Sequence, residues 1–177
     1  MPFAFELFLD STTERLVREV WRRYAELGIS SYLAESDSRP HVTMAVFDEL
    51  TIEECQVLLN NFVARKRLIT LEISHLGLFY SAKNVVYLGP TVTEELLQLH
   101  RDFHRIFERF MEHEWDCYRR GRWVPHCTLG VEIPKERLPE AVAAGMELIP
   151  LPLACRVEEV GLIEFSPVRH LCSCKLG

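Results

Sequence analysis

Two short stretches of the sequence each place a histidine two residues before a threonine. They are PHVTMAVF at residues 40–47 and PHCTLGVEI at residues 125–133. An imidazole titrates near neutral pH and can take or give a proton there, and a hydroxyl group can donate a hydrogen bond to an anionic oxygen. A site that combines these groups suits the chemistry of a phosphate or acyl group. The four residues concerned are His41, Thr43, His126 and Thr128.

Both stretches have the composition of strands, in which successive side chains alternate between two faces. The histidine and threonine of each stretch should therefore share one polar face. The other face should be apolar and should pack into the core, with Val42, Met44 and Val46 in the first stretch and Cys127, Leu129 and Val131 in the second. By the same alternation, Phe47 has the parity of His41 and is a candidate for lining a substrate cleft.

The segments around the two stretches follow a common order. In the first half a strand at 3–9 leads through a capping box at Ser11–Glu14 into a helix that Gly28 can end. The first His-x-Thr strand, a helix from 51 to 66 and strand sequence over 68–80 follow. In the second half a strand at 84–90, a capping box at Thr91–Glu94 and an amphipathic helix over 94–110 precede the second His-x-Thr strand. A helix over 135–148, which Pro139 can interrupt, and closing strands at 153–165 and 170–176 complete the chain.

The repeated order predicts a duplicated α+β unit, with repeats of roughly 1–84 and 85–177 forming one domain over 1–177. A half alone would leave one face of its sheet uncovered, so the two halves should pack together. Two lobes that face each other would bring both His-Thr faces into a central cleft.

Composition limits the range of functions. The chain has 177 residues, of which 48% are hydrophobic, and this is enough for a sizeable core. A net charge of −6 argues against binding extended nucleic acid through many phosphate contacts. No apolar run reaches the roughly 20 residues of a membrane span. The six cysteines and the absence of a secretory signal predict a cytoplasmic protein with reduced thiols.

The paired motifs HVTM and HCTL, in matching strand context, resemble those of the 2H phosphoesterase superfamily. The resemblance implies a bilobed, pseudo-two-fold α+β fold in which each lobe is an antiparallel sheet covered by helices. It also implies a cytosolic phosphoesterase that needs no metal or other cofactor. Members include 2′,3′-cyclic phosphodiesterases and 2′-5′ RNA ligases. The ligase-like branch commonly has an arginine a few residues after the second threonine, where this chain has Leu-Gly-Val-Glu at 129–132.

On this basis we expect hydrolysis of a 2′,3′-cyclic phosphate or a related nucleotide or RNA-end phosphodiester. His41 and His126 would act as the acid and base, in an order that the sequence does not assign. Thr43 and Thr128 would stabilise the charged phosphate oxygens. The alternative is a nucleotide- or RNA-end-binding module on the same scaffold that has lost turnover. We expect a monomer whose partner is a small nucleotide or an RNA terminus.

Further residues are candidates for binding substrate. In RRGRWVP, before the second motif, Arg119, Arg120 or Arg122 can reach a phosphate and Trp123 can stack on a base, although this loop can equally be solvated with Trp123 packed on the domain. Tyr80 and Lys83 lie in a turn where the same choice applies. Two other groups have metal-ligand spacing but too few ligands for a site. These are His100 with His104, and His170 with Cys172 and Cys174.

Overall fold

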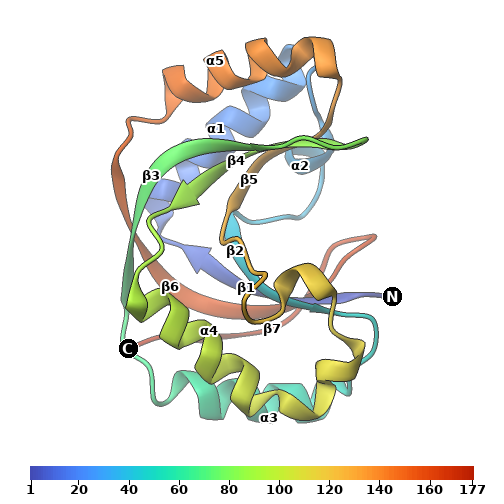
Figure 1. The fold of residues 1–177 in the computed structure, drawn as a ribbon, viewed down its shortest axis with the longest axis vertical. Coiled ribbons are helices and arrows are strands. Elements are labelled where there is room, and N and C mark those ends of the chain that lie inside the picture. Colours follow the sequence, from blue (N-terminus) through green and yellow to red (C-terminus); the bar gives the residue numbers. More distant parts are fainter.

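Strand β6 (Leu153–Glu164) joins two parts of one seven-stranded sheet in the computed structural model, which describes residues 1–177 (Figure 1). The start of β6 pairs with β3, and its remainder pairs with β1 on one side and β7 on the other. The strand order is β2-β1-β6-β3-β4-β5, and all pairings are antiparallel. The other strands are β1 (Phe3–Leu9), β2 (His41–Phe47), β3 (Ile69–Phe79), β4 (Asn84–Pro90), β5 (Cys127–Ile133) and β7 (Arg169–Lys175).

The helices lie in two pairs, one at each end of the view in Figure 1. Helix α1 packs on α5, and α3 packs on α4. Because α1 follows β1 but packs on β5, each helix pair combines one helix from each half of the sequence. These helices are α1 (Ser11–Glu26), α3 (Ile52–Val63), α4 (Glu94–Ile106) and α5 (Leu138–Leu148), and the short turns are α2 (Tyr32–Glu35), η1 (Glu108–His113), η2 (Asp116–Tyr118) and η3 (Lys135–Arg137). The arrangement confirms the predicted α+β class with antiparallel strands.

Several helix ends differ in detail from the sequence prediction. Helix α1 is capped by the Asp10 carboxylate, which accepts the backbone N–H groups of residues 12 and 13. The cap of α4 is Thr93. The first cap lies one residue before the predicted one and the second lies two residues after it. Nearby Asp and Thr side chains can satisfy the same free N–H groups. Pro139 does not interrupt α5 but lies in its first turn, where a missing N–H costs nothing.

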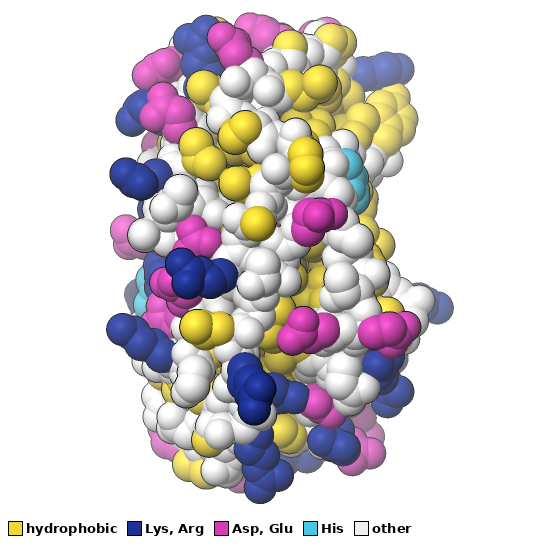
Figure 2. Space-filling model, turned by 90° about the vertical axis from the view of Figure 1, so that its left-hand side faces the viewer, with side chains coloured by type: hydrophobic (Ala, Val, Ile, Leu, Met, Phe, Trp, Pro, Cys, Tyr) yellow, Lys and Arg dark blue, Asp and Glu magenta, His cyan; other side chains and the backbone are white.

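The core falls into two clusters on opposite faces of the sheet. The larger lies between sheet and helices and includes the Phe5, Phe103 and Phe107 rings. The smaller comprises Ala4, Phe8, Val46 and Ile163 and lies on the other face, where no helix pair covers it. None of the helices combines the length and apolar character needed to cross a membrane. On the face shown in Figure 2, acidic and basic side chains are interspersed and form no continuous basic surface.

Close packing against the smaller cluster gives a stability prediction. A Cβ on Gly161 would lie 2.3 Å from the ring of Phe8, which is almost fully buried. We expect Gly161→Ala to lower the free energy of unfolding by about 1–3 kcal/mol through overpacking. Urea unfolding measures this loss. Shortening the neighbour in Gly161→Ala/Phe8→Leu should recover part of it, and purely additive losses in the double mutant would contradict the predicted contact.

Candidate active site

Both His-x-Thr motifs line a single cavity of about 190 Å³. His41 and Thr43 enter it from β2, and His126 and Thr128 enter it at the start of β5. The two motifs come from opposite halves of the sequence, and strands β2 and β5 contact each other beside the cavity. The structure thus brings together all four residues that the sequence singled out for chemistry.

The two imidazoles are oriented in the same way. Nδ1–H of His41 donates to the backbone carbonyl of Arg39 at 2.5 Å, and Nδ1–H of His126 donates to that of Val124 at 2.7 Å. A carbonyl can only accept, so each Nδ1 carries its proton. Each Nε2 is therefore the nitrogen that can exchange a proton in the cavity.

A β-bulge in each motif strand changes which side chains face the cavity. In β2, Thr43 pairs with Glu6 and Ala45 with Phe5, so Met44 is an extra residue. In β5, Thr128 pairs with Tyr87 and Gly130 with Val86, so Leu129 is extra. A bulge reverses the alternation of side chains beyond it. Contrary to the sequence prediction, Val46 and Val131 consequently line the cavity.

The buried carboxyl group of Glu6 lies against His41. Its Oε1 is 3.2 Å from His41 Nε2, and the residue is only 3% exposed. Burial raises the pKa of Glu6 to about 8, against smaller opposing effects of His170 and Arg39. Burial also lowers the pKa of His41 to about 4. Near neutral pH the pair therefore holds one shared proton and is electrically neutral.

His126 has a different environment. Its ring packs against the rings of Phe79 and Tyr87, with centroids 4.9 and 5.3 Å away. Burial is the main cause that lowers the pKa of His126, and the nearby charge of His41 adds to the effect. The His126 imidazole is therefore held in its neutral form, ready to accept a proton at Nε2.

Aromatic side chains surround the mouth of the cavity. Tyr32 comes from α2, Trp115 from the loop between η1 and η2, and Phe165 from the end of β6. The Trp115 and Phe165 rings meet edge to face, with centroids 5.9 Å apart. Trp115 Nε1–H also donates to the Asp48 carboxylate at 2.8 Å, which fixes the indole. Tyr118 of η2 completes the wall beside Thr43.

Three of the residues considered for substrate contact lie elsewhere. Phe47 is fully buried in the larger cluster, because the bulge at Met44 turns it away from the cavity. Tyr80 lies in the exposed β3–β4 turn, where the Lys135 ammonium group is 5.7 Å from its ring centroid. Lys83 in the same turn pairs with the Glu132 carboxylate at 2.5 Å. None of the three lines the cavity.

Residues of the loop before the second motif lie outside the cavity, and one of them hydrogen-bonds to a motif strand. Arg122 is exposed and pairs with Asp116. Trp123 donates its Nε1–H to the carbonyl of Thr43 at 2.8 Å and stacks on His100, with 4.1 Å between ring centroids. On the other side of the site, Trp21 of α1 donates to the carbonyl of Thr128 at 3.0 Å. An indole N–H thus binds a backbone carbonyl of each motif strand. Trp123 packs on the domain and does not line the cavity.

Four of the five residues with metal-ligand spacing, namely His100, His104, His170 and Cys174, make hydrogen bonds within the fold. His100 Nε2 lies 3.2 Å from the carbonyl of Met44, a group at the bulge. His104 lies between the His100 carbonyl and the Glu114 carboxylate, which is 2.7 Å from His104 Nε2. His170 donates to the carbonyl of Asp37, and Cys174 donates to the Asn60 side chain.

The sequence carried one signal that could have indicated Glu6. Glu6 is the single acidic residue in the apolar strand FAFELFL, and a carboxyl group is unusual in a strand that is otherwise buried. The aromatic residues at the mouth had no such signal, because they lie on three separate segments. The bulges also have no distinctive sequence, so the positions of Val46 and Val131 could be learned only from the register.

This geometry defines the class of protein. Two His-x-Thr strands that meet in one cavity of a pseudo-symmetric antiparallel fold are the arrangement implied by the resemblance to 2H phosphoesterases. The profile of the 2′-5′ RNA ligase superfamily matches residues 13–168, and the chain belongs to this superfamily. Among functionally curated proteins, no sequence is similar enough to count as a match.

Solved structures share the fold over almost the whole chain. The E. coli protein LigT in its apo form has a TM-score of 0.62 and 19% identity, with 99% of this chain and 96% of LigT covered. LigT has also been crystallised with 3′-AMP, at 20% identity and 99% coverage of both chains. The Thermus thermophilus protein TT0787 has a TM-score of 0.69 and 16% identity, with 99% of this chain and 98% of that protein covered.

The hydrogen bond from Trp123 to the first motif strand gives a testable prediction. Trp123→Phe removes the N–H that the Thr43 carbonyl accepts but keeps an aromatic ring on His100. A partly buried carbonyl without a partner should lower the free energy of unfolding by about 1–3 kcal/mol. Urea unfolding measures the change. The control is Trp115→Phe, whose N–H is bound to an exposed carboxylate and should matter less; equal losses would contradict the assignment.

Proposed function

We propose that the protein hydrolyses a 2′,3′-cyclic phosphate, or a related phosphodiester of a nucleotide or RNA end, by proton transfer between substrate and two histidines. The observation that carries this proposal is that His41, Thr43, His126 and Thr128 all line one cavity. Membership of the 2′-5′ RNA ligase superfamily agrees with it. The bound 3′-AMP of the LigT structure is a nucleotide of the kind that such a reaction produces.

The reaction needs two proton transfers. A water oxygen forms a bond to phosphorus while the bond from phosphorus to one sugar oxygen breaks. The water gives up a proton to a base, and the leaving sugar oxygen receives one from an acid. The hydroxyl groups of Thr43 and Thr128 donate hydrogen bonds to the non-bridging phosphate oxygens, where charge develops in the transition state.

The unlike surroundings of the two histidines support one assignment of these roles. His126 is neutral and accepts the proton of the attacking water at Nε2. The Glu6–His41 pair holds the proton that the leaving oxygen receives. The negative charge of a bound phosphate favours the imidazolium form of His41. Entry of the substrate therefore draws this proton from Glu6 onto His41 Nε2, from which it passes to the sugar oxygen.

The first test removes each imidazole in turn. We expect His41→Ala and His126→Ala each to reduce hydrolysis of a nucleoside 2′,3′-cyclic phosphate by roughly 10²- to 10⁴-fold. Initial rates in the presence of a chelator measure this, and circular dichroism checks the fold. His113→Ala, which changes an exposed histidine of η1, is the matched control and should keep full activity.

Activity that survives both single substitutions would refute the proposal. Tight binding of cyclic nucleotides by the unchanged protein without any turnover would favour the alternative, a binding module on this scaffold. A calorimetric titration with a cyclic nucleotide distinguishes these two functions, because only turnover releases heat continuously after binding is complete.

The second test concerns pH. With a pKa of about 8, Glu6 loses its proton as the pH rises through that value, and the pair becomes negative. We expect kcat/KM to fall through the same range, because the acid is lost and an anionic substrate is repelled. In Glu6→Gln this alkaline fall should disappear, and overall activity should drop by no more than the roughly 10²- to 10⁴-fold that a general acid supplies.

Glu114→Gln is the matched control for this experiment. Glu114 is the second buried carboxyl group that contacts a histidine, and it lies away from the cavity. Its substitution should leave the pH profile of kcat/KM unchanged. An alkaline limb that persists in Glu6→Gln would show that the Glu6–His41 pair is not the source of the proton.

A further inference from the structure

The cavity that holds the two motifs has an unusual composition for a phosphate site. Of its sixteen lining residues ten are hydrophobic, and the polar ones are Glu6, Ser38, His41, Thr43, His126 and Thr128. No guanidinium or ammonium group is among them. Val131, three residues after Thr128, occupies the stretch where the ligase-like branch commonly has an arginine. The phosphate must therefore be held by neutral donors and by the histidines.

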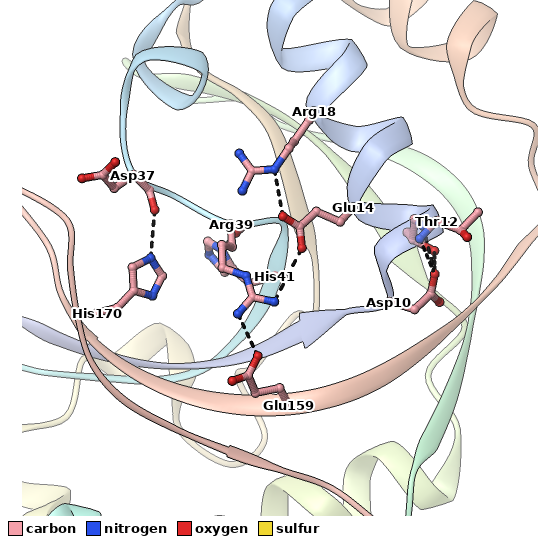
Figure 3. A network of polar contacts seen from close by, with 10 residues as sticks. Asp10, Thr12, Glu14, Arg18, Asp37, Arg39, His41, Glu159 and His170 are labelled. Carbon is pink, nitrogen blue, oxygen red and sulfur yellow. Dashed lines mark hydrogen bonds and ion pairs between the residues drawn. The ribbon is translucent and has the colours of Figure 1, made fainter.

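Three arginines near the cavity, Arg39, Arg119 and Arg122, are paired with carboxylates. Arg120 lies outside the cavity and lines a separate cleft. Arg39 lies in the loop between α2 and β2, where it pairs with Glu14 of α1 and Glu159 of β6, as Figure 3 shows. Its guanidinium also covers the Phe8 ring, with 4.1 Å from its central carbon to the ring centroid. In the loop before β5, Arg119 and Arg122 both pair with Asp116.

The charge available to a ligand can be counted from these contacts. The Glu6–His41 pair is neutral while it holds its one proton. His126 is neutral when it acts as the base, so the cavity offers no net positive charge before a substrate enters. A cyclic phosphodiester brings one negative charge into this site. A phosphate monoester brings about −1.5 to −2 near pH 7 and is disfavoured.

The remainder of the ligand is expected at the aromatic mouth. A cavity of about 190 Å³ is smaller than the roughly 300–1,000 Å³ of typical ligand pockets, so it cannot enclose a whole nucleotide. Tyr32 and Trp115 are 49% and 38% exposed at its entrance, which is high for large aromatic residues. Exposed aromatic faces beside a phosphate site are suited to stacking on a nucleobase.

We infer that the site selects nucleoside 2′,3′-cyclic phosphates that carry no other phosphate group, with the base against the Tyr32–Trp115–Phe165 wall. This inference rests on the proposed function and specifies its substrate class. A 5′-phosphate or a diphosphate on the same nucleoside brings extra negative charge, and the residues that line the cavity include no Lys or Arg to neutralise it. The monoester product is disfavoured for the same reason and should be released readily.

The test compares two substrates that differ only in one phosphate. They are adenosine 2′,3′-cyclic phosphate and the same compound with an added 5′-phosphate. We expect kcat/KM to be at least about tenfold higher for the compound without it, at constant low ionic strength. The monoester product should inhibit weakly, with an inhibition constant well above the KM of the cyclic substrate.

A positive charge placed in the cavity should remove or reverse the preference for the substrate without a 5′-phosphate. Val131→Arg supplies a guanidinium and should bring the ratio of the two kcat/KM values towards one or below. Val131→Met is the matched control, since it adds a long neutral side chain and should keep the ratio. Val168→Arg and Val168→Met repeat the comparison at the half-buried rim in the β6–β7 turn, should the β5 variants fail to fold.

The outcomes separate this inference from the function on which it rests. Equal kcat/KM for the two substrates in the unchanged protein, or an unchanged ratio in both arginine variants, would overturn the inference and leave the proposed hydrolysis standing. Hydrolysis of neither substrate would overturn the proposed function, and the substrate class with it.

Discussion

The extra residue in each motif strand is the constraint on which the site depends. At Met44 and at Leu129 the strand has one more residue than its neighbour, so two successive residues face the core before alternation resumes. The His and Thr that precede each bulge face the cavity together with the valine that follows it. The backbone groups disturbed by a bulge need new partners. His100 contacts the carbonyl of Met44, and the Ser30 hydroxyl donates to the carbonyl of Val131.

The same constraint explains why parts of the site could be predicted and others could not. The pairing of each His with its Thr depends only on strand alternation over three residues before the bulge, so it was evident from the sequence. Beyond the bulge that alternation fails, which is why Phe47 was expected in the cleft and Val131 in the core. The fold class was accessible because the order of elements repeats. The origin of the chain by duplication at about residue 84 stays a prediction.

Contacts between segments that are distant in the chain could not be predicted from the sequence. Trp123 resembled a residue for stacking on a base, yet its indole N–H binds a carbonyl of the other motif strand, 80 residues away in the chain. Tyr32, Trp115 and Phe165 gave no sign of acting together, because only the tertiary structure brings α2, the η1–η2 loop and the end of β6 to one opening. A basic loop beside the motif was a reasonable source of a phosphate-binding arginine, but Asp116 engages two of its guanidinium groups.

The near symmetry of the two motifs makes the difference between their neighbours important. Glu6 pairs across the sheet with Thr43, and Tyr87 pairs with Thr128 in the equivalent place. One histidine therefore lies beside a buried carboxyl group and the other beside an aromatic ring. Two histidines in identical surroundings would titrate alike and could not divide the roles of acid and base efficiently. The two motif strands are alike, but a carboxyl group lies at one of the two equivalent positions and an aromatic ring at the other. This single difference makes the two histidines chemically unlike. It also determines how much positive charge a phosphate can meet in the cavity.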